Sequence, residues 1–261
     1  MKKLLAALTI ALLATASIGA HAKDWTTIRF GVDASYPPFE SKGTDGKLVG
    51  FDIDVGNEIC KRINAKCVWV ESAFDGMIPA LKARKFDAVL SSMSMTPQRE
   101  AQIAFSAKVF HTPTRLVAKQ GSSLQPTADS LKGKTVGVEQ GSIQESYAKA
   151  QWAPNGVKIV PYQDQDQVYA DLLAGRLDAA LQDAVQADMG FLKTPRGAGF
   201  AFTGGDLSDP NGALGNGAAI GLRKEDTDLK TKIDKALADM IKDGTYKKIE
   251  SRYFAFDVYG G

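Results

Sequence analysis

The stretch from Ser91 to Arg99 carries the side chains best suited to hold a carboxylate. It reads SSMSMTPQR and places the hydroxyls of Ser91, Ser92 and Ser94 shortly before the guanidinium of Arg99. A guanidinium can bind a carboxylate through two parallel hydrogen bonds. Glu100 follows directly, however, and charged pairs are common in exposed loops. Spacing alone therefore favours neither of two interpretations of Arg99, an anion-binding residue or a solvated surface charge.

A second candidate is the tripeptide Gln140-Gly141-Ser142, which lies between a predicted strand and a predicted helix. Glycine lets the backbone approach a ligand, and a helix N-terminus presents free N–H groups to an anion. The alternative is a simple helix N-cap by Ser142. The sequence contains neither a G-x-G-x-x-G fingerprint nor a phosphate-binding loop, so nothing indicates a nucleotide.

Two aromatic residues, Tyr36 and Phe74, each follow a predicted strand. Two aromatic faces could hold an extended side chain between them and attract a cation at its tip. Most aromatic residues belong to the core, so these two residues alone indicate little.

The segments that position these residues alternate between strands and helices. Near the end of the chain, Leu229, Ile233, Leu237 and Ile241 trace one helix face, and Gly244 is a suitable stop. Such alternation predicts an α/β fold with mainly parallel sheets. The predicted strands are 28–32, 67–70, 87–90, 135–138, 158–160 and 179–181, and the other predicted helices are 51–65, 75–84, 143–151 and 165–174.

A weak internal repeat predicts two similar lobes. Residues 81–92 read LKARKFDAVLSS and residues 172–183 read LLAGRLDAALQD. Earlier in each half, Gly31-Val32-Asp33 matches Gly137-Val138-Glu139. Short α/β units resemble one another by chance, but two matches in the same order favour a real duplication. We expect lobe 1 to comprise 23–111 and 217–261, lobe 2 to comprise 115–205, and two hinge crossings at about 111–115 and 205–217.

Polar residues end several of these strands, and ligands of open α/β sheets bind beyond the carboxyl ends of strands. If the two lobes face each other, these residues line the cleft between them. They are Asp33, Ser91, Ser92, Glu139 and Asp183.

The first 22 residues differ from the rest of the chain. Lys2-Lys3 precede an apolar run over 4–13, and Ala20-His21-Ala22 offers small residues around a cleavage site. This pattern predicts a secretory signal peptide cut after Ala22, so that the mature protein begins at Lys23. The run is short for a membrane anchor, and no cysteine follows the cleavage site for a lipid anchor.

The whole sequence has a net charge of +2, and Lys2-Lys3 account for it. The mature chain is therefore balanced, and we expect neither nucleic acid nor an anionic membrane as a partner. In an exported protein the two cysteines, Cys60 and Cys67, are expected to form a disulfide. A metal site is the alternative, but the one mature histidine, His111, has no clustered ligands nearby. We expect no metal and no cofactor.

The chain resembles the periplasmic polar amino-acid-binding proteins of ABC importers, in particular the lysine/arginine/ornithine- and histidine-binding group. The resemblance implies a type II periplasmic binding protein fold, in which two α/β lobes close on a free L-amino acid. The matching segments span the mature chain: SYPPFESKGTDGKLVGFDIDVGNEICKR, FDGMIPALKARKFDAVLSSMSMTPQR, SLKGKTVGVEQGS, AGRLDAALQD and DGTYKKIESRYFAFDVYG.

The resemblance also assigns the candidate residues to parts of a bound amino acid. It implies that Arg99 holds the α-carboxylate and Asp183 the α-ammonium, and it matches Cys60 and Cys67 to a disulfide of the family. The supporting residues are Ser94 and the backbone near Ser142 and Ile143 for the carboxylate, Ser91 or Ser92 for the ammonium, Tyr36 and Phe74 stacked on the side chain, and Asp33 and Gln144 towards its distal end.

Two positions depart from the family pattern. Many relatives have an apolar residue in place of Glu139 and a threonine in place of Ile143. Glu139 is either a second anion for the cationic tip of a ligand or a residue that points away from it. Phe74 favours the arginine/lysine/ornithine type of pocket, because a smaller aliphatic residue is usual in the histidine type.

We therefore expect a monomeric periplasmic receptor that binds a cationic amino acid, closes, and delivers it to the membrane permease of an ABC importer. The alternative is a periplasmic enzyme on the same fold, such as a dehydratase, with Asp33, Glu139 and Asp183 as acid–base groups. No nucleophile–base pair stands out, which favours binding over catalysis. A third interpretation is a receptor that also signals through a membrane sensor.

Overall fold

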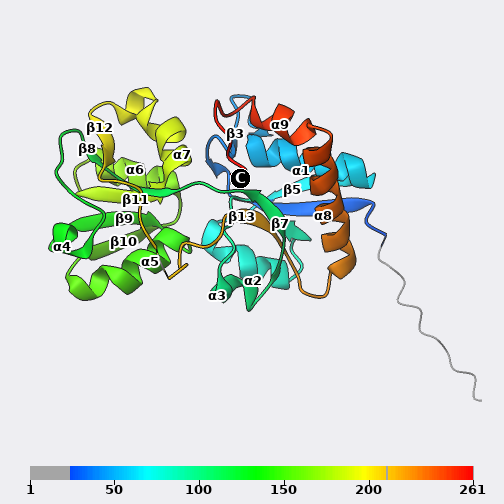
Figure 1. Cartoon of the computed structure of the whole chain (residues 1–261), viewed down its shortest axis with the longest axis horizontal. Coiled ribbons are helices and arrows are strands. Elements are labelled where there is room, and N and C mark those ends of the chain that lie inside the picture. The colour runs from blue at the N-terminus through cyan, green and yellow to red at the C-terminus, as the bar shows by residue number, and fades with distance from the viewer. Residues whose placement is uncertain (1–23, 210, 261) are drawn as a thin grey trace, which may run out of the picture.

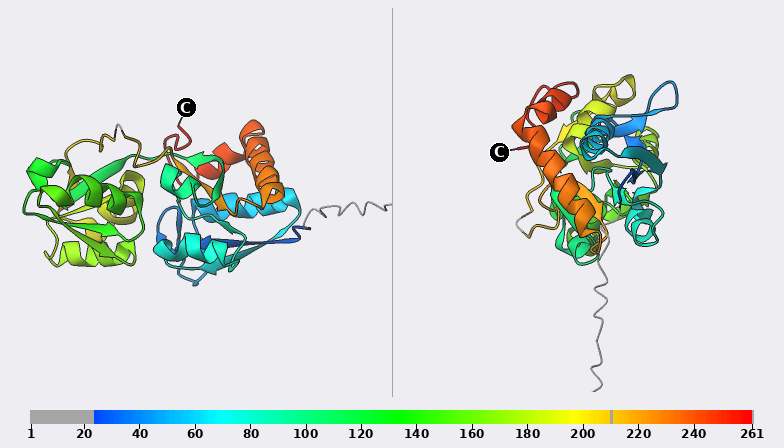
Figure 2. Two further views of the ribbon diagram at one scale, coloured as in Figure 1. Left: turned by 90° about the horizontal axis from the view of Figure 1, so that it is seen from below. Right: turned by 90° about the vertical axis from the view of Figure 1, so that its right-hand side faces the viewer.

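The computed structural model describes residues 24–209 and 211–260, and two lobes lie side by side along the long axis of the molecule (Figures 1 and 2). Each lobe is built on its own five-stranded sheet. The predicted signal peptide, its cleavage site and Lys23 lie outside the described residues. Within them, no helix combines the length and the apolar character needed to cross a membrane.

The sheet of lobe 1 has the strand order β5-β1-β6-β13-β7. Strand β1 is parallel to both β5 and β6, whereas β13 is antiparallel to its neighbours β6 and β7. The strands are β1 (Thr27–Val32), β5 (Lys66–Glu71), β6 (Ala88–Val89), β7 (Ala104–Phe110) and β13 (Ala218–Leu222).

The sheet of lobe 2 repeats this pattern with the order β10-β9-β11-β8-β12. Strand β9 is parallel to β10 and β11, and β8 is antiparallel to β11 and β12. The strands are β8 (Thr114–Lys119), β9 (Thr135–Glu139), β10 (Lys158–Tyr162), β11 (Ala179–Asp183) and β12 (Phe200–Thr203).

The chain passes between the lobes twice, through 111–113 from β7 to β8 and through 204–217 from β12 to β13 (Figure 1). The antiparallel fourth strand of each sheet is the strand that has just arrived from the other lobe. The two connections therefore enter the sheets at equivalent places, β8 in lobe 2 and β13 in lobe 1.

Helices cover both faces of each sheet, and a separate apolar cluster fills each of the four interfaces. The long helices α1 and α8 pack against each other on one face of lobe 1. In lobe 1 the helices are α1 (Phe51–Ile63), α2 (Met77–Lys82) with the short turn η1 (Phe74–Gly76), α3 (Pro97–Glu100), α8 (Thr227–Lys242) and α9 (Thr245–Glu250). In lobe 2 they are α4 (Ala128–Leu131), α5 (Ile143–Gln151), η2 (Ala153–Asn155), α6 (Gln165–Leu173), α7 (Ala184–Ala187), the π-helix η3 (Asp188–Leu192) and η4 (Pro195–Gly197).

The two stretches of the internal repeat occupy equivalent places in the two lobes. Asp87 precedes β6 and accepts a hydrogen bond from the backbone N–H of Arg29 at 3.1 Å. Asp178 precedes β11 and accepts one from the N–H of Thr135 at 2.8 Å. Each aspartate thus ties the start of one strand to the neighbouring parallel strand, which explains why both stretches have an aspartate at this position.

The same equivalence explains two glycines in the matched strands. A Cβ on Gly31 would lie 2.6 Å from the ring of Phe86, and one on Gly137 would lie 2.4 Å from the side chain of Leu177. Phe86 and Leu177 stand at corresponding positions of the repeat. A glycine is therefore needed in each lobe where a large apolar side chain crosses the first strand.

The predicted face of the last long helix is wrong at one position. Helix α8 buries Leu229, Ile233 and Leu237 as expected, but Met240 is buried and Ile241 is 42% exposed. At about 100° per residue, position 240 returns to within about 20° of Leu229, whereas position 241 lies about 120° away. Helix α8 ends at Lys242, close to Gly244 with its positive φ of 79°.

Several elements of the structure have no counterpart among the predictions. Strands β7, β8, β12 and β13 flank the two connections, in stretches to which the sequence assigns no strand. A small sheet with the order β2-β3-β4 follows β1 and carries Tyr36 on its first strand. Its strands are β2 (Ser35–Tyr36), β3 (Glu40–Lys42) and β4 (Leu48–Val49), which are too short to show a periodic pattern.

The expected disulfide is confirmed. Cys60 in α1 and Cys67 in β5 are bonded, with their Cα atoms 5.7 Å apart. The bond closes the turn between the helix and the edge strand of the lobe 1 sheet. For so short a loop the constraint on the unfolded chain is worth about 2–3 kcal/mol.

Candidate ligand-binding site

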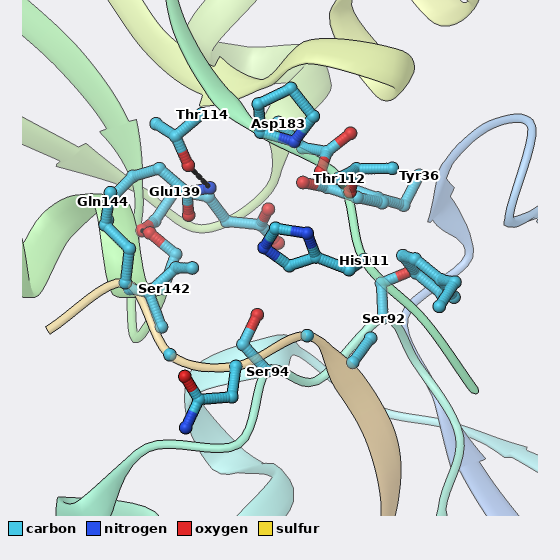
Figure 3. Close-up of a pocket in the computed structure, with 18 of the residues that line it drawn as sticks. Tyr36, Ser92, Ser94, His111, Thr112, Thr114, Glu139, Ser142, Gln144 and Asp183 are labelled. Carbon is cyan, nitrogen blue, oxygen red and sulfur yellow. Dashed lines mark hydrogen bonds between the residues drawn. The ribbon is translucent and has the colours of Figure 1, made fainter. Parts of the chain in front are cut away.

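A cavity of about 280 Å³ lies between the two lobes (Figure 3). Its walls come from the strand ends of both sheets and from both connections. The structure brings every predicted ligand-binding residue to this one space: Asp33, Tyr36, Phe74, Ser91, Ser92, Ser94, Arg99, Glu139, Ser142, Ile143, Gln144 and Asp183. Their roles towards a ligand remain predictions.

Asp33 lies just beyond β1 and is held by three hydrogen bonds. Its Oδ1 accepts from the backbone N–H and the hydroxyl of Ser35 at 3.0 and 2.6 Å, and its Oδ2 accepts from the N–H of Phe74 at 3.2 Å. Burial raises the pKa of the Asp33 carboxyl, and the bonds from Ser35 oppose this shift. The carboxylate is therefore fixed in orientation at the lobe 1 wall.

Ser91 and Ser92 follow β6, and both hydroxyls donate to one buried carboxylate. Ser91 Oγ and Ser92 Oγ each lie 3.2 Å from an oxygen of Glu40. A hydroxyl has one proton, so a serine that donates it to Glu40 can only accept hydrogen bonds from other groups. The two serines are therefore set as acceptors, which suits an ammonium group in the cavity.

Glu40 is itself paired with a second buried acid, Asp52, at the start of α1. Asp52 accepts from the backbone N–H of Ser92 at 2.8 Å. Burial raises the pKa of both carboxyls, that of Asp52 to about 7. The charge of Asp52 adds to the shift of Glu40, whereas the backbone N–H of Ser92 opposes the shift of Asp52. Two carboxyls this close hold one proton between them, because two adjacent buried charges would repel.

Arg99 resides in α3, whose N-cap Thr96 accepts from the Arg99 backbone N–H. The guanidinium donates to the carbonyl of Ser94 at 2.8 Å and to the carbonyl of Gly141 at 3.0 Å. It also lies 5.4 Å from the ring centroid of Phe74. Arg99 is 8% exposed, and burial lowers its pKa to about 10. Arg99 thus lines the cavity between the lobes and is not a solvated surface charge.

The lobe 2 wall begins where β9 leads into α5. Ser142 Oγ donates to the carbonyl of Glu139 at 2.6 Å and accepts from the N–H of Glu145 at 3.0 Å. Ser142 is therefore the N-cap of α5, which is the alternative to an anion-binding role, and it also lines the cavity. Two residues further on, the Gln144 amide donates to Thr114 Oγ1 at 3.2 Å, the bond drawn in Figure 3.

Glu139 ends β9 and lines the cavity with an exposed fraction of 5%. Within residues 24–209 and 211–260, its carboxylate has no hydrogen bond or ion pair. Burial raises its pKa well above the ordinary range, and the charges of Asp33 and Asp164 add to the shift. The charge of Arg99 opposes it. Of the two interpretations of Glu139, the structure favours a side chain that belongs to the cavity.

Asp183 ends β11, at the position in lobe 2 that Ser92 occupies in the repeat of lobe 1. Its Oδ1 accepts from the N–H groups of Val185 and Gln186, both at 2.9 Å, and its Oδ2 accepts from the hydroxyl of Thr112. Burial raises the pKa of Asp183 to about 6. The first connection between the lobes thus contacts this carboxylate directly.

Other lining residues were not predicted. Thr112 and Thr114 come from the first connection and the start of β8, and the second connection contributes a run that ends at β13. Sequence patterns place these segments only as crossings, because nothing in an irregular loop indicates which side chains face a cavity. The unpredicted lining residues are Glu40, Phe110, His111, Thr112, Pro113, Thr114, Leu207, Asp209, Gly212, Leu214, Gly215, Asn216, Gly217 and Ala218.

The chemistry of this site is that of binding an ion-paired small molecule. Among the described residues that line the cavity, Arg99 is the only lysine or arginine. The part of the chain that the structure describes has no group of three or more histidine, cysteine or acidic side chains arranged to hold a metal ion. Two similar α/β lobes around a polar cavity, joined by two connections, define the class of two-lobed solute-binding proteins.

Comparison with known proteins agrees with this class. Residues 28–256 match the family described as bacterial extracellular solute-binding proteins, family 3, and the chain belongs to that family. It is 51% identical over 260 residues to the lysine/arginine/ornithine-binding periplasmic protein of Escherichia coli (strain K12) and 50% identical over 261 residues to the histidine-binding periplasmic protein of the same strain. Both alignments cover 100% of each chain.

A solved structure supports the fold. An ancestral arginine-binding protein bound to arginine superimposes with a TM-score of 0.82 at 36% identity, covering 90% of this chain and 100% of that one. The predicted two-lobed fold and the resemblance to the lysine/arginine/ornithine- and histidine-binding group are both confirmed. These relatives are binding proteins by name, not enzymes.

Proposed function

We propose that this protein is a periplasmic receptor for a cationic L-amino acid, with arginine, lysine and ornithine as ligands and histidine as a weaker one. It is exported by its signal peptide, matures at Lys23, acts as a monomer, and delivers the ligand to the permease of an ABC importer. The names of its full-length relatives support the ligand class and the compartment.

The observation that carries the proposal is the charge balance of the cavity. One guanidinium, that of Arg99, stands against five acids that line the same space: Asp33, Glu139 and Asp183, together with Glu40 behind the two serines and Asp209 on the second connection. The α-carboxylate of a free amino acid matches Arg99, and its α-ammonium matches one carboxylate. The remaining carboxylates call for a further positive charge on the ligand side chain.

The orientation of the groups supports the assignment of the α-ammonium to Asp183. Ser92 Oγ donates to Glu40 and so faces the ligand as an acceptor. An ammonium has three donors, and Asp183 together with Ser91 or Ser92 would accept them. Ser94 and the backbone at Ser142 and Ile143 would then assist Arg99 on the carboxylate.

The ligand side chain would extend between Tyr36 and Phe74 towards Asp33 and Gln144. Aromatic faces suit the methylene groups of arginine and lysine as well as their cationic tips. Ile143 offers no hydroxyl to the ligand, so the selectivity rests on the carboxylates and the aromatic pair.

We further propose that the two connections are hinges, at about 111–115 and 205–217, between lobe 1 (23–111 and 217–261) and lobe 2 (115–205). The cavity lies between the lobes, so a movement of one lobe against the other would open or close it. Closure would bury the ion pairs and would present one closed surface to the permease.

Calorimetric titration with the twenty common amino acids and ornithine tests this function. We expect arginine, lysine and ornithine to bind more tightly than histidine, and histidine more tightly than neutral or acidic amino acids. Tightest binding of a non-cationic amino acid would overturn the ligand class. Recovery of chemically unchanged ligand after long incubation supports a receptor, whereas conversion of the ligand would support a dehydratase-like enzyme.

A further inference from the structure

We propose that Glu139 is a specificity-determining residue, which pairs with the cation at the tip of the ligand side chain and works together with Asp33. This inference rests on the proposed function of the site and deepens it. It names the group by which the cavity distinguishes a cationic side chain from a neutral one of the same shape.

The first argument is the position of the carboxylate. Glu139 is the last residue of β9, at the carboxyl end of the lobe 2 sheet, and it faces the cavity with 5% exposure. Asp33 is the residue after β1, at the equivalent end of the lobe 1 sheet. The two carboxylates therefore approach the cavity from opposite lobes, and each can contact a cation held between them.

The second argument is the lack of a protein partner for the Glu139 carboxylate among the described residues. Asp33 and Asp183, by contrast, each accept three hydrogen bonds from the protein. The Glu139 carboxylate is not sealed inside the protein but opens onto the cavity, where a ligand can reach it. A ligand cation would supply the missing partner in the closed cleft.

The third argument is the set of charges that surround Glu139. The charges of Asp33, Asp75 and Asp164 raise the pKa of Glu139, and the charge of Arg99 lowers it. Of these groups, Asp33 and Arg99 line the cavity with Glu139, so two acids there stand against one cation. Since Arg99 is needed for the α-carboxylate, the field that remains attracts a second cation.

The competing interpretation is that Glu139 acts only on Arg99 and tunes its hold on the α-carboxylate. Every amino acid has that carboxylate, so a change at Glu139 would then alter all affinities by a similar factor. A role at the side-chain tip would alter only the affinities of cationic ligands. L-Arginine and L-citrulline separate the two roles, because citrulline has the shape of arginine without its side-chain charge.

The experiment is a four-way comparison by calorimetry of arginine and citrulline with the wild type and with Glu139→Gln. We expect the preference for arginine over citrulline to fall by about ten- to a hundredfold in the variant, the usual worth of a hydrogen bond to a charged group. Citrulline affinity should change by less than about threefold. Glu139→Leu should behave in the same way, and Asp129→Asn, an exposed acid of α4, is the matched control.

Thermal unfolding without ligand gives a second readout. Because the Glu139 carboxyl has no partner among the described residues, the melting temperature of Glu139→Gln should equal or exceed that of the wild type. A lower melting temperature with an unchanged arginine preference would mean that Glu139 has a structural role only, and would overturn the inference. An equal loss for both ligands would assign Glu139 to Arg99 instead. If the wild type binds no cationic amino acid, the proposed function itself fails, which is a different outcome.

Discussion

The guanidinium of Arg99 in lobe 1 donates a hydrogen bond to the backbone carbonyl of Gly141 in lobe 2, with a distance of 3.0 Å between Nη2 and O. Beside it, the Gln140 amide donates to Asp75 at 2.8 Å. The residue proposed to hold the ligand carboxylate therefore also contacts the opposite lobe. The side chain of Arg99 would therefore take part both in ligand binding and in the contact between the closed lobes.

Gly141 lies where this contact permits no side chain. Its φ is +79°, and a Cβ would approach the Cα of Asp75 to 2.7 Å. We expect Gly141→Ala to keep the lobes from closing fully and to weaken all ligands alike, by roughly tenfold or more, because the added Cβ would collide with Asp75 of the other lobe and overpacking typically costs about 1–3 kcal/mol. Calorimetry and small-angle scattering with saturating arginine measure both effects.

The matched control for this prediction is Gly175→Ala. Gly175 has a φ of +72°, and a Cβ there would meet nothing within 4 Å. The control has the same backbone strain without the contact between lobes, so it should bind ligands as the wild type does. Equal affinities of the two variants would contradict a role of Gly141 in closure.

Arg99 is the residue on which all ligands should depend. We expect Arg99→Ala to weaken every amino acid by about 2–5 kcal/mol, because the ligand carboxylate would be buried without its partner. Arg99→Lys should restore the affinity only in part, since an ammonium lacks the planar fork of a guanidinium. Circular dichroism checks the fold, and near-normal affinity in a folded Arg99→Ala variant would refute the assignment.

The sequence predicts the parts of this protein that depend on local periodicity and on repetition. The strand at 28–32 and the helix at 51–65 follow from the spacing of apolar residues, and the structure has them within one or two residues. The two-lobed arrangement follows from the matched strand ends. Ile241 was assigned to the wrong face because a four-residue spacing, repeated three times, drifts away from the true helical period.

The polar layer behind the cavity could not be predicted in the same way. Glu40 and Asp52 lie on different elements and meet only because β3 and α1 pack beside the end of β6. The contact of Thr112 with Asp183 likewise joins residues 71 positions apart. Such pairs depend on tertiary packing, which a single sequence does not reveal.

Asp183 should make ligand binding dependent on pH. Burial raises its pKa to about 6, and only the ionised carboxylate can pair with an α-ammonium. A bound ammonium lowers this pKa, so binding releases a proton below about pH 6 and the affinity falls as the pH drops, by up to about tenfold per pH unit. Calorimetry between pH 5 and 8 should show this fall for every ligand that the wild type binds.

Asp183→Asn tests the same assignment without changing the pH. The variant should weaken all ligands strongly, since each of them has an α-ammonium, and the dependence that comes from Asp183 should disappear. A loss confined to arginine and lysine would show instead that Asp183 contacts the side chain of the ligand.

The buried pair Glu40 and Asp52 should affect stability rather than ligand choice. Burial raises the pKa of Asp52 from 3.8 to about 7, so between these values the native state binds more protons than the unfolded chain. The free energy of unfolding therefore falls as the pH rises from about 4 through 7, and the penalty is fully present above the folded pKa.

In Asp52→Asn the amide still accepts from the Ser92 N–H, can donate to Glu40, and has no charge to bury. We expect the variant to match the wild type near pH 4 and to be more stable at pH 8, by a margin that grows across this window. Urea unfolding at several pH values, with Asp129→Asn as the control, measures that margin. Parallel curves for the wild type and Asp52→Asn would show that the pair titrates as it does in the unfolded chain.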